Sequence, residues 1–237
     1  MPGRAEAVAG LPVSLPLRPA LLAGREELLA ELDARLTEGD GSGPRVVALH
    51  GLGGAGKTSV AVEYAHRHLA EVGLAWQFPA GDREVLLAEF VRLAVRLGAR
   101  EVADARDPVA SVHAALAAFP ADWLLEFDDA IGYEAVRGFL PPAGRGRVLI
   151  TSQSGAWPGG WAVEVPVLGT RVAAEFLVNR TGDPDVSLDV YLHAIGSASS
   201  GPFLGKKPPV FDFTMDEVVH ADLAGARVVH VKALAIR

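Results

Sequence analysis

The chain contains no cysteine among its 237 residues. Disulfide bonds and thiolate metal ligands are therefore excluded. No apolar run reaches the ~18 residues that a transmembrane helix needs. The N-terminus also lacks the charged region and long apolar core of a secretion signal. These absences predict a cytoplasmic protein that has no membrane as a partner.

Clusters of basic residues are also missing. The chain has 22 Lys and Arg against 29 Asp and Glu, which gives a formal net charge of −7. This balance argues against nucleic acid as the main partner. Half of the residues are hydrophobic and 22% are charged, as in ordinary globular proteins. The length suffices for one α/β domain with a substantial core plus an appendage.

The most informative segment that is present reads Gly-Leu-Gly-Gly-Ala-Gly-Lys-Thr, at residues 51–58, directly after the apolar run 46–50. It fits the phosphate-binding pattern G-x-x-x-x-G-K-[ST] in its context of strand, loop and helix. Glycines let backbone N–H groups approach phosphates, and the following helix directs its positive end at the anion. Lys57 can place a charge on the β- and γ-phosphates, and the Thr58 hydroxyl can ligate Mg²⁺. The alternative is an accidental glycine-rich turn, which this context disfavours. The sequence predicts binding of a nucleoside triphosphate or diphosphate.

A second apolar run, 123–127, leads into Asp128 and Asp129. P-loop NTPases need a carboxylate at the end of a neighbouring strand for the Mg²⁺ shell. We therefore predict Asp128 as a metal ligand with Thr58, and Asp129 as a group that polarises the attacking water or supports the metal shell. The alternative is an ordinary turn with two solvated aspartates. Glu126 lies where an apolar residue is expected, so it needs a partner or an exposed edge.

Gln153 follows the next apolar run, Arg147–Thr151. A polar residue at the end of the strand beside the metal strand can reach the γ-phosphate and report its presence. Gln153 would do so by a hydrogen bond without charge. The alternative, a polar loop residue without such a role, is equally compatible with the sequence.

Apolar periodicity alternates between strands and helices along most of the chain. This predicts an α/β fold, a P-loop NTPase three-layer sandwich with a mostly parallel five-stranded sheet, followed by an irregular C-terminal tail. We predict a flexible N-terminal arm over 1–18, a nucleotide-binding domain over 19–183 and a divergent or truncated tail over 184–237. The expected strands are 46–50, 74–78, 123–127, 147–151 and 162–165. The expected helices are 25–36, 57–70, 83–97, 108–119 and 170–179.

Several segments together resemble the NB-ARC branch of the STAND signal-transduction ATPases, in particular the bacterial members followed by tetratricopeptide repeats. Residues 22–26, Leu-Ala-Gly-Arg-Glu, are similar to the family's "V/F-x-G-R-E" segment. Residues 48–58 are similar to its P-loop, 61–65 to the helix that follows, 123–130 to its metal strand and 147–153 to its sensor strand. The likeness covers about residues 19–182.

The resemblance implies ATP or ADP as the ligand with Mg²⁺, and a signalling switch with slow or absent hydrolysis. Self-association or an effector protein is compatible with it as a further partnership. It implies Asp129 and Gln153 as catalytic residues and Thr58 and Asp128 as metal ligands. The implied nucleotide-binding residues are Arg25, Gly51, Gly53, Gly54, Ala55, Gly56, Lys57, Thr58 and Ser59.

The chain departs from this family in two places. Gln153 stands where the family usually has arginine. No segment after residue 183 matches the "G-L-P-L-A" segment that closes over the adenine. Three functions therefore compete: a signalling switch, a conventional P-loop ATPase that drives a mechanical or loading step, and a non-enzymatic remnant that binds nucleotide without cycling.

Overall fold

The structure, a computed structural model, describes residues 12–37, 43–98, 107–181, 218–221 and 228–231. Its centre is a six-stranded sheet whose paired strands all run parallel, in the order β1-β3-β4-β5-β2-β6. The strands are β1 (Val13–Ser14), β2 (Arg45–His50), β3 (Leu74–Pro79), β4 (Trp123–Ala130), β5 (Gly146–Ser152) and β6 (Ala162–Glu164). The predicted α/β fold with a mostly parallel sheet is confirmed.

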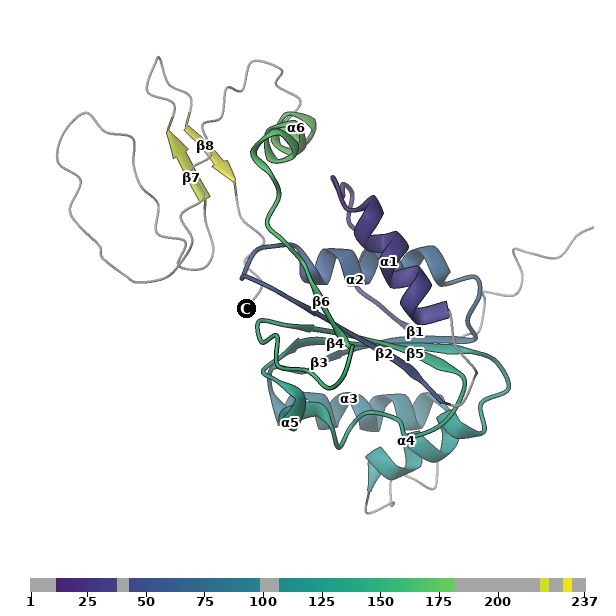
Figure 1. The fold of residues 1–237 in the computed structure, drawn as a ribbon. Coiled ribbons are helices and arrows are strands. Elements are labelled where there is room, and N and C mark those ends of the chain that lie inside the picture. The colour runs from purple at the N-terminus through teal and green to yellow at the C-terminus, as the bar shows by residue number, and fades with distance from the viewer. Residues whose placement is uncertain (1–11, 38–42, 99–106, 182–217, 222–227, 232–237) are drawn as a thin grey trace, which may run out of the picture.

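Helices cover both faces of the sheet and complete three layers (Figure 1). One face carries α1 (Glu26–Thr37) and α2 (Lys57–His68), and the other carries α3 (Arg83–Arg96), α4 (Pro108–Ala117) and the short α5 (Tyr133–Val136). A further helix, α6 (Thr170–Thr181), follows β6. The start of α4 follows from its sequence, because the Asp107 carboxylate accepts hydrogen bonds from the backbone N–H groups of Val109 and Ala110.

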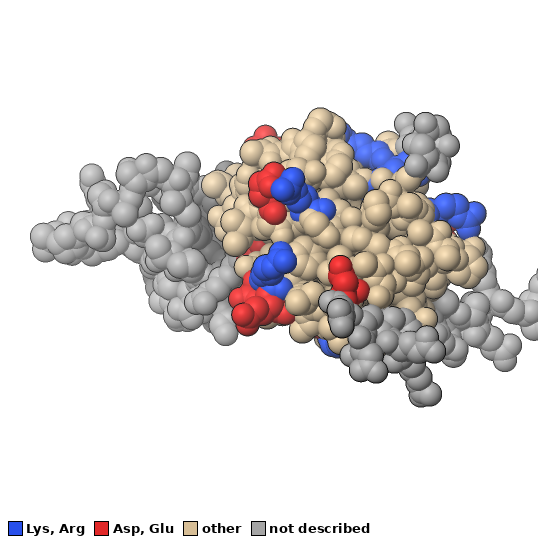
Figure 2. Space-filling model, turned by 90° about the horizontal axis from the view of Figure 1, so that it is seen from below, with Lys and Arg blue, Asp and Glu red and all other residues tan. Residues whose placement is uncertain are grey.

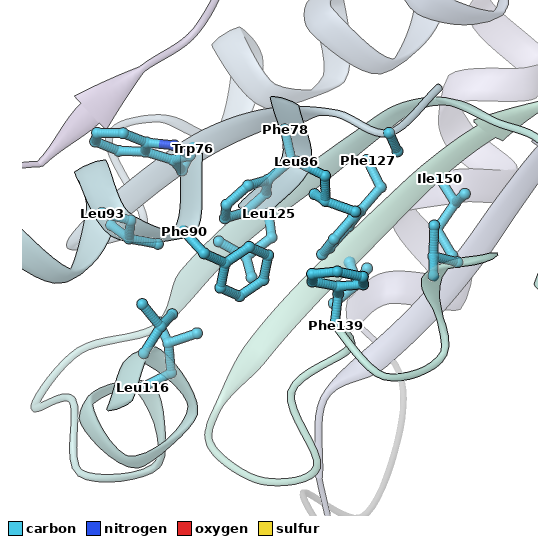
Figure 3. Packing of buried hydrophobic residues seen from close by; sticks show 14 of the residues in the cluster. Trp76, Phe78, Leu86, Phe90, Leu93, Leu116, Leu125, Phe127, Phe139 and Ile150 are labelled. Atoms are coloured by element: carbon cyan, nitrogen blue, oxygen red, sulfur yellow. The ribbon is translucent and has the colours of Figure 1, made fainter. Parts of the chain in front are cut away.

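The side chains of β4 belong to two separate hydrophobic cores, because successive side chains of a strand point to opposite faces of the sheet. Leu125 and Phe127 pack under α3 and α4, whereas Leu124 packs under α1 and α2. In the first core, Phe78 stacks between Phe90 and Phe127, with ring centroids 4.5 and 4.9 Å apart. Figure 3 shows these rings between the sheet and α3. The packing buries β4 and β5 between the two helical layers, and these two strands carry part of the candidate site.

The sixth strand is the main difference from the predicted sheet of five. β1 lies within the predicted N-terminal arm and pairs with β3 through Val13↔Ala75 and Ser14↔Trp76. Two residues are too few to show strand periodicity, so the sequence pattern could not reveal them. Residues 1–11 of the arm lie outside the described residues.

The predicted irregular tail contains an antiparallel pair of strands, β7 (Val218–Ala221) and β8 (Val228–Val231). The rest of the predicted tail lies outside the described residues. Within the described ranges, no helix has both the length and the apolar character needed to cross a membrane.

Candidate functional site

The predicted phosphate loop connects β2 to α2, at the carboxyl edge of the sheet. Three of its glycines have positive φ: Gly51 (146°), Gly54 (77°) and Gly56 (91°). A Cβ on Gly51 would lie 2.6 Å from the Val165 carbonyl oxygen, and Gly56 is the left-handed residue directly before α2. These positions need glycine for the path of the backbone itself. Gly53 has no positive φ and open space around it, so the backbone does not explain its glycine.

Lys57 begins α2 and is only 2% exposed. Its ammonium donates hydrogen bonds to the carbonyl oxygens of Gly51 at 3.0 Å and Leu52 at 2.8 Å. Burial lowers the pKa of Lys57, and the nearby carboxylates of Asp129 and Asp128 oppose this shift. The structure therefore holds a buried cation against the inner side of the phosphate loop, where the sequence predicted it.

Asp128 is the centre of a hydrogen-bond network that joins three elements. Its Oδ1 accepts from the Thr58 hydroxyl at 2.6 Å and from the Thr151 hydroxyl at 2.7 Å. The same Thr151 oxygen accepts from the Asp129 backbone N–H at 2.8 Å. The predicted pair Thr58 and Asp128 is thus in direct contact. Sequence reasoning assigned no role to Thr151, although a hydroxyl residue at the end of the strand beside β4 was the available signal.

Asp128 and Asp129 lie in a β-bulge of β4. The pairs Phe127↔Ile150 and Ala130↔Ser152 leave one extra residue on β4. Asp129 sits there with φ 60°, the one non-glycine residue with positive φ in the described part of the chain. Such bulges redirect side chains, and a left-handed non-glycine residue stores strain that functional sites often use. Burial, together with the charge of Asp128, raises the pKa of Asp129, and Lys57 opposes this shift.

Arg25, a predicted nucleotide-binding residue, lies beside the phosphate loop. The residue is 5% exposed, and one guanidinium nitrogen, Nη2, donates to the carbonyl oxygens of Ala55 and Pro166, both at 2.7 Å. Burial lowers its pKa. Arg25 therefore ties the loop to the segment that follows β6. Ala55 is buried and Ser59 is half-buried on the first turn of α2.

Gln153 is exposed and follows β5 directly, at the same edge of the sheet as Asp128. The Ser154 backbone N–H bonds the Ser152 hydroxyl at 3.0 Å and so shapes the turn. The turn places Gln153 two residues beyond Thr151. The structure therefore brings Gln153 to the edge that carries Thr58 and Asp128, and the Gln153 side chain adds no positive charge there.

Glu126, which needed a partner, is fully buried on β4. One carboxyl oxygen, Oε1, accepts from Gln77 Nε2 at 3.2 Å, and the other, Oε2, is buried without a hydrogen-bond partner. Burial is the main cause that raises the pKa of Glu126 to about 8; the charge of Asp128 acts in the same direction, and Gln77 opposes both. Its surroundings therefore favour the protonated, neutral form of Glu126.

The donors at this edge fit a hard cation. Mg²⁺ prefers oxygen ligands and uses one or two carboxylates together with phosphates and waters. The Thr58 hydroxyl and the Asp128 carboxylate, 2.6 Å apart, have this chemistry. No group of three or more His, Cys, Asp or Glu residues that could hold a metal occurs in the described ranges. The donor set therefore fits a cation that takes its remaining oxygen ligands from bound phosphates and waters, rather than one enclosed by protein.

The parallel sheet, the glycine loop and the Lys57, Thr58 and Asp128 constellation define a P-loop ATPase domain that binds nucleotide. A family model described as AAA ATPase domain matches residues 21–158, more than half of the chain. The chain therefore belongs to this family. A search of curated proteins found no match.

One solved structure with a TM-score above 0.5 shows the same fold, and two others are similar to parts of this chain. Cdc6p from Pyrobaculum aerophilum is 16% identical with a TM-score of 0.54, over 71% of this chain and 52% of that one. A STAND protein with a tetratricopeptide repeat sensor from Pyrococcus horikoshii is 17% identical with a TM-score of 0.45, over 73% and 28%. The Aeropyrum pernix Orc1 protein, in complex with DNA, is 20% identical with a TM-score of 0.48, over 71% and 52%. The chain spans about half the length of the Cdc6p and Orc1 chains.

Proposed function

We propose that this chain is a nucleotide-operated signalling switch of NB-ARC type, which binds ATP or ADP with Mg²⁺ and hydrolyses ATP slowly or not at all. In this proposal the nucleotide-binding domain extends over about residues 19–183, and residues 184–237 are a divergent or truncated C-terminal tail. The observation that carries the proposal is the contact between Thr58 and Asp128 at 2.6 Å beside the phosphate loop, together with the uncharged Gln153 at the same edge.

The proposed binding role follows from charge and geometry. The Lys57 ammonium, now bound to loop carbonyls, is buried beside the glycines and can turn to phosphate oxygens with little movement. Backbone N–H groups at the start of α2 supply further donors to an anion. Thr58 and Asp128 would hold Mg²⁺, which would offset the charge of the β- and γ-phosphates when bound.

The residues beside Thr58 and Asp128 support the proposal of slow turnover. Asp129 can orient a water, and its raised pKa suits a proton acceptor better than an ordinary aspartate would. Gln153 supplies no positive charge, and a comparable arginine can be worth ~10³–10⁵ in rate. Arg145 and Arg147 are engaged at the opposite, amino edge of the sheet, with Asp122 and Glu71 respectively. A nucleotide that is turned over slowly acts as a ligand that selects conformational states.

A conventional P-loop ATPase that drives a mechanical or loading step is the second candidate. Membership of the AAA ATPase domain family favours it. It requires faster turnover than the switch, so the rate separates the two. A remnant that binds nucleotide without cycling would show binding and no turnover in any variant.

A phosphate-release assay at saturating Mg-ATP tests the proposal. We expect a rate well below the ~1–100 s⁻¹ typical of kinases. Gln153→Arg should raise the rate or the affinity for ATP, whereas Ala156→Arg, an exposed position in the same loop, should do neither. Turnover of several per second that disappears in Lys57→Ala would replace the switch with the conventional ATPase.

A further inference from the structure

The segment that follows β6 contacts the beginning of the phosphate loop. The Val165 backbone N–H donates a hydrogen bond to the carbonyl oxygen of His50, the last residue of β2, at 2.7 Å. The Val165 carbonyl oxygen lies so close to Gly51 that a Cβ on this glycine would be 2.6 Å from it. Segments in such close contact do not shift independently of each other. A change in the loop backbone at Gly51 therefore acts directly on Val165.

The next residue of the same segment is joined to the far part of the loop through Arg25. The Arg25 nitrogen Nη2 donates to the carbonyl oxygens of both Pro166 and Ala55, each at 2.7 Å. Ala55 directly precedes Gly56, the left-handed residue before α2. Two consecutive residues, Val165 and Pro166, are therefore connected to both ends of the phosphate loop.

This segment leads directly into α6, which begins at Thr170. Figure 1 shows α6 outside the layers that cover the sheet. The residue before Arg25 packs against the first turn of this helix. Gly24 has φ 61°, and a Cβ on it would lie 2.7 Å from Val172 Cγ1. Residues 24 and 25 therefore contact the phosphate loop, the segment before α6 and α6 itself.

Arg25 carries a buried charge, and no carboxylate among the described residues pairs with it. The residue is 5% exposed, and the two oxygens that it binds are carbonyl oxygens. Burial lowers the pKa of Arg25, and no carboxylate opposes this shift. Burying an unpaired charge is costly, and an anion close by reduces the cost. Phosphate groups in the loop would supply this negative charge and would stabilise the arrangement in which Arg25 joins the loop to Pro166.

We propose that Arg25 couples nucleotide in the phosphate loop to the position of α6. With nucleotide bound, Arg25 holds Ala55 and Pro166 together, and α6 is held against Gly24. Without nucleotide, the charge of Arg25 is not compensated and α6 is held less firmly. Arg25 is thus a positioning residue, which acts through carbonyl oxygens of the loop rather than by touching a phosphate.

The coupling rests on the proposed function, because a switch needs an element whose position depends on the ligand. Here that element is α6. Coupling between two sites is reciprocal, so the contact of α6 with Gly24 should also raise the affinity of the loop for nucleotide.

Hydrogen exchange of the full chain, with and without saturating ADP, tests the coupling. In the parent, ADP should slow the exchange of amides over residues 167–181 by at least about fivefold. Arg25→Gln removes the charge and shortens the side chain, so it should abolish this slowing while ADP still binds. The measured quantity is the difference that ADP makes, which a purely structural role of Arg25 would leave in place.

Arg92→Gln is the matched control. Arg92 pairs with Glu89 on α3, on the opposite face of the sheet, which Figure 2 views from below. ADP should slow exchange over 167–181 in this variant as it does in the parent. Calorimetry on each variant establishes that ADP is bound under the conditions of the exchange experiment.

Reciprocity gives a second test from the side of α6. Val172→Ala shortens the side chain that packs against Gly24, so the affinity for ADP should fall by about fivefold. Arg171→Ala is its control, because the Arg171 side chain is 83% exposed and pairs with Glu175 of the same helix. This control should leave the affinity for ADP unchanged.

Three results would each overturn the coupling. They are slowing by ADP that persists in Arg25→Gln, a parent that binds ADP without slower exchange over 167–181, and a parent-like affinity for ADP in Val172→Ala. If circular dichroism shows that Arg25→Gln does not fold, the affinity of Val172→Ala decides. A parent that binds no ADP would contradict the proposed function itself, and the coupling with it.

Discussion

At the scale of single residues, the site depends on one carboxylate oxygen. Asp128 Oδ1 accepts from both Thr58 and Thr151, and the same Thr151 oxygen also fixes the Asp129 backbone. One hydroxyl on β5 therefore positions both aspartates of β4. The short distances and the burial of Thr151 leave the Asp128 carboxylate one orientation, with its charge directed at the start of α2.

We predict that Asp128→Asn weakens binding of Mg-ATP by about tenfold or more, and of metal-free ADP much less. The amide keeps an acceptor for the two hydroxyls and removes the charge that a cation needs. Calorimetry with and without EDTA measures both affinities. Asp122→Asn, an exposed aspartate at the opposite edge of the sheet, is the control. Equal losses for both ligands would mean that Asp128 serves the fold rather than the metal.

Glu126 makes stability depend on pH. Its pKa is raised from 4.5 to about 8, so the folded state holds a proton that the unfolded state releases. The stability that this bound proton contributes to the folded state is fully present below about pH 4.5. It is lost as the pH rises to about 8. The free energy of unfolding should therefore fall over this window, which is the reverse of the trend expected for a carboxylate with a salt-bridge partner.

We predict that the Tm of the Glu126→Gln variant declines less than the Tm of the parent between pH 5 and 8.5. At pH 8.5 the Tm of the variant should be several degrees higher than that of the parent. About 1 kcal/mol corresponds to roughly 2–4 °C in domains of this size. Thermal melts in EDTA, without nucleotide, check it. Glu134→Gln, on an exposed pair with Arg137, is the control. Parallel pH curves for the Glu126 variant and the parent would contradict the assigned cause.

At the scale of elements, the segment before α1 connects the sheet edge to the phosphate-loop helix. Arg18 donates two hydrogen bonds to Glu63 of α2, at 2.7 and 2.8 Å, and the Pro16 carbonyl bonds the His66 ring at 2.9 Å. The hydrogen bond from Arg18 is the largest cause that lowers the pKa of Glu63 to about 2. The segment is thereby fixed to α2 as well as to β3.

Arg18→Gln should release this segment. We expect faster hydrogen exchange at the Ala75 amide, which bonds the Pro12 carbonyl oxygen at 3.2 Å, and little change in the centre of β4. Arg35→Gln, which breaks an exposed pair with Glu31 of the same helix, should leave the Ala75 amide unchanged. If exchange at Ala75 is insensitive to Arg18, backbone pairing alone holds β1 to the sheet.

The sequence predicted the long elements well because their periodicity and caps are local. The strand–loop–helix at 45–68 and the Asp107 cap are clear examples. It could not predict the order of the strands or the two-residue β1, since both depend on pairing between distant segments. The bulge at Asp129 and the role of Thr151 were also out of reach, because they arise from the register of β4 against β5.

At the scale of the whole molecule, the two sides of the sheet carry different features. One side of the sheet carries α1 and α2, and the other carries α3, α4 and α5 with the aromatic core beneath them (Figures 1 and 3). The central claim is that nucleotide binds at Lys57 and the phosphate loop. Both the switch and the conventional ATPase depend on that binding.

Calorimetric titration of ADP into the parent and into Lys57→Ala tests this claim most directly. A charge-assisted hydrogen bond of this kind contributes roughly 1.5–3 kcal/mol, or about ten- to a hundredfold in affinity. We predict a loss of at least that size in Lys57→Ala, with an unchanged circular dichroism spectrum. Equal ADP affinity for the variant and the parent would contradict the account.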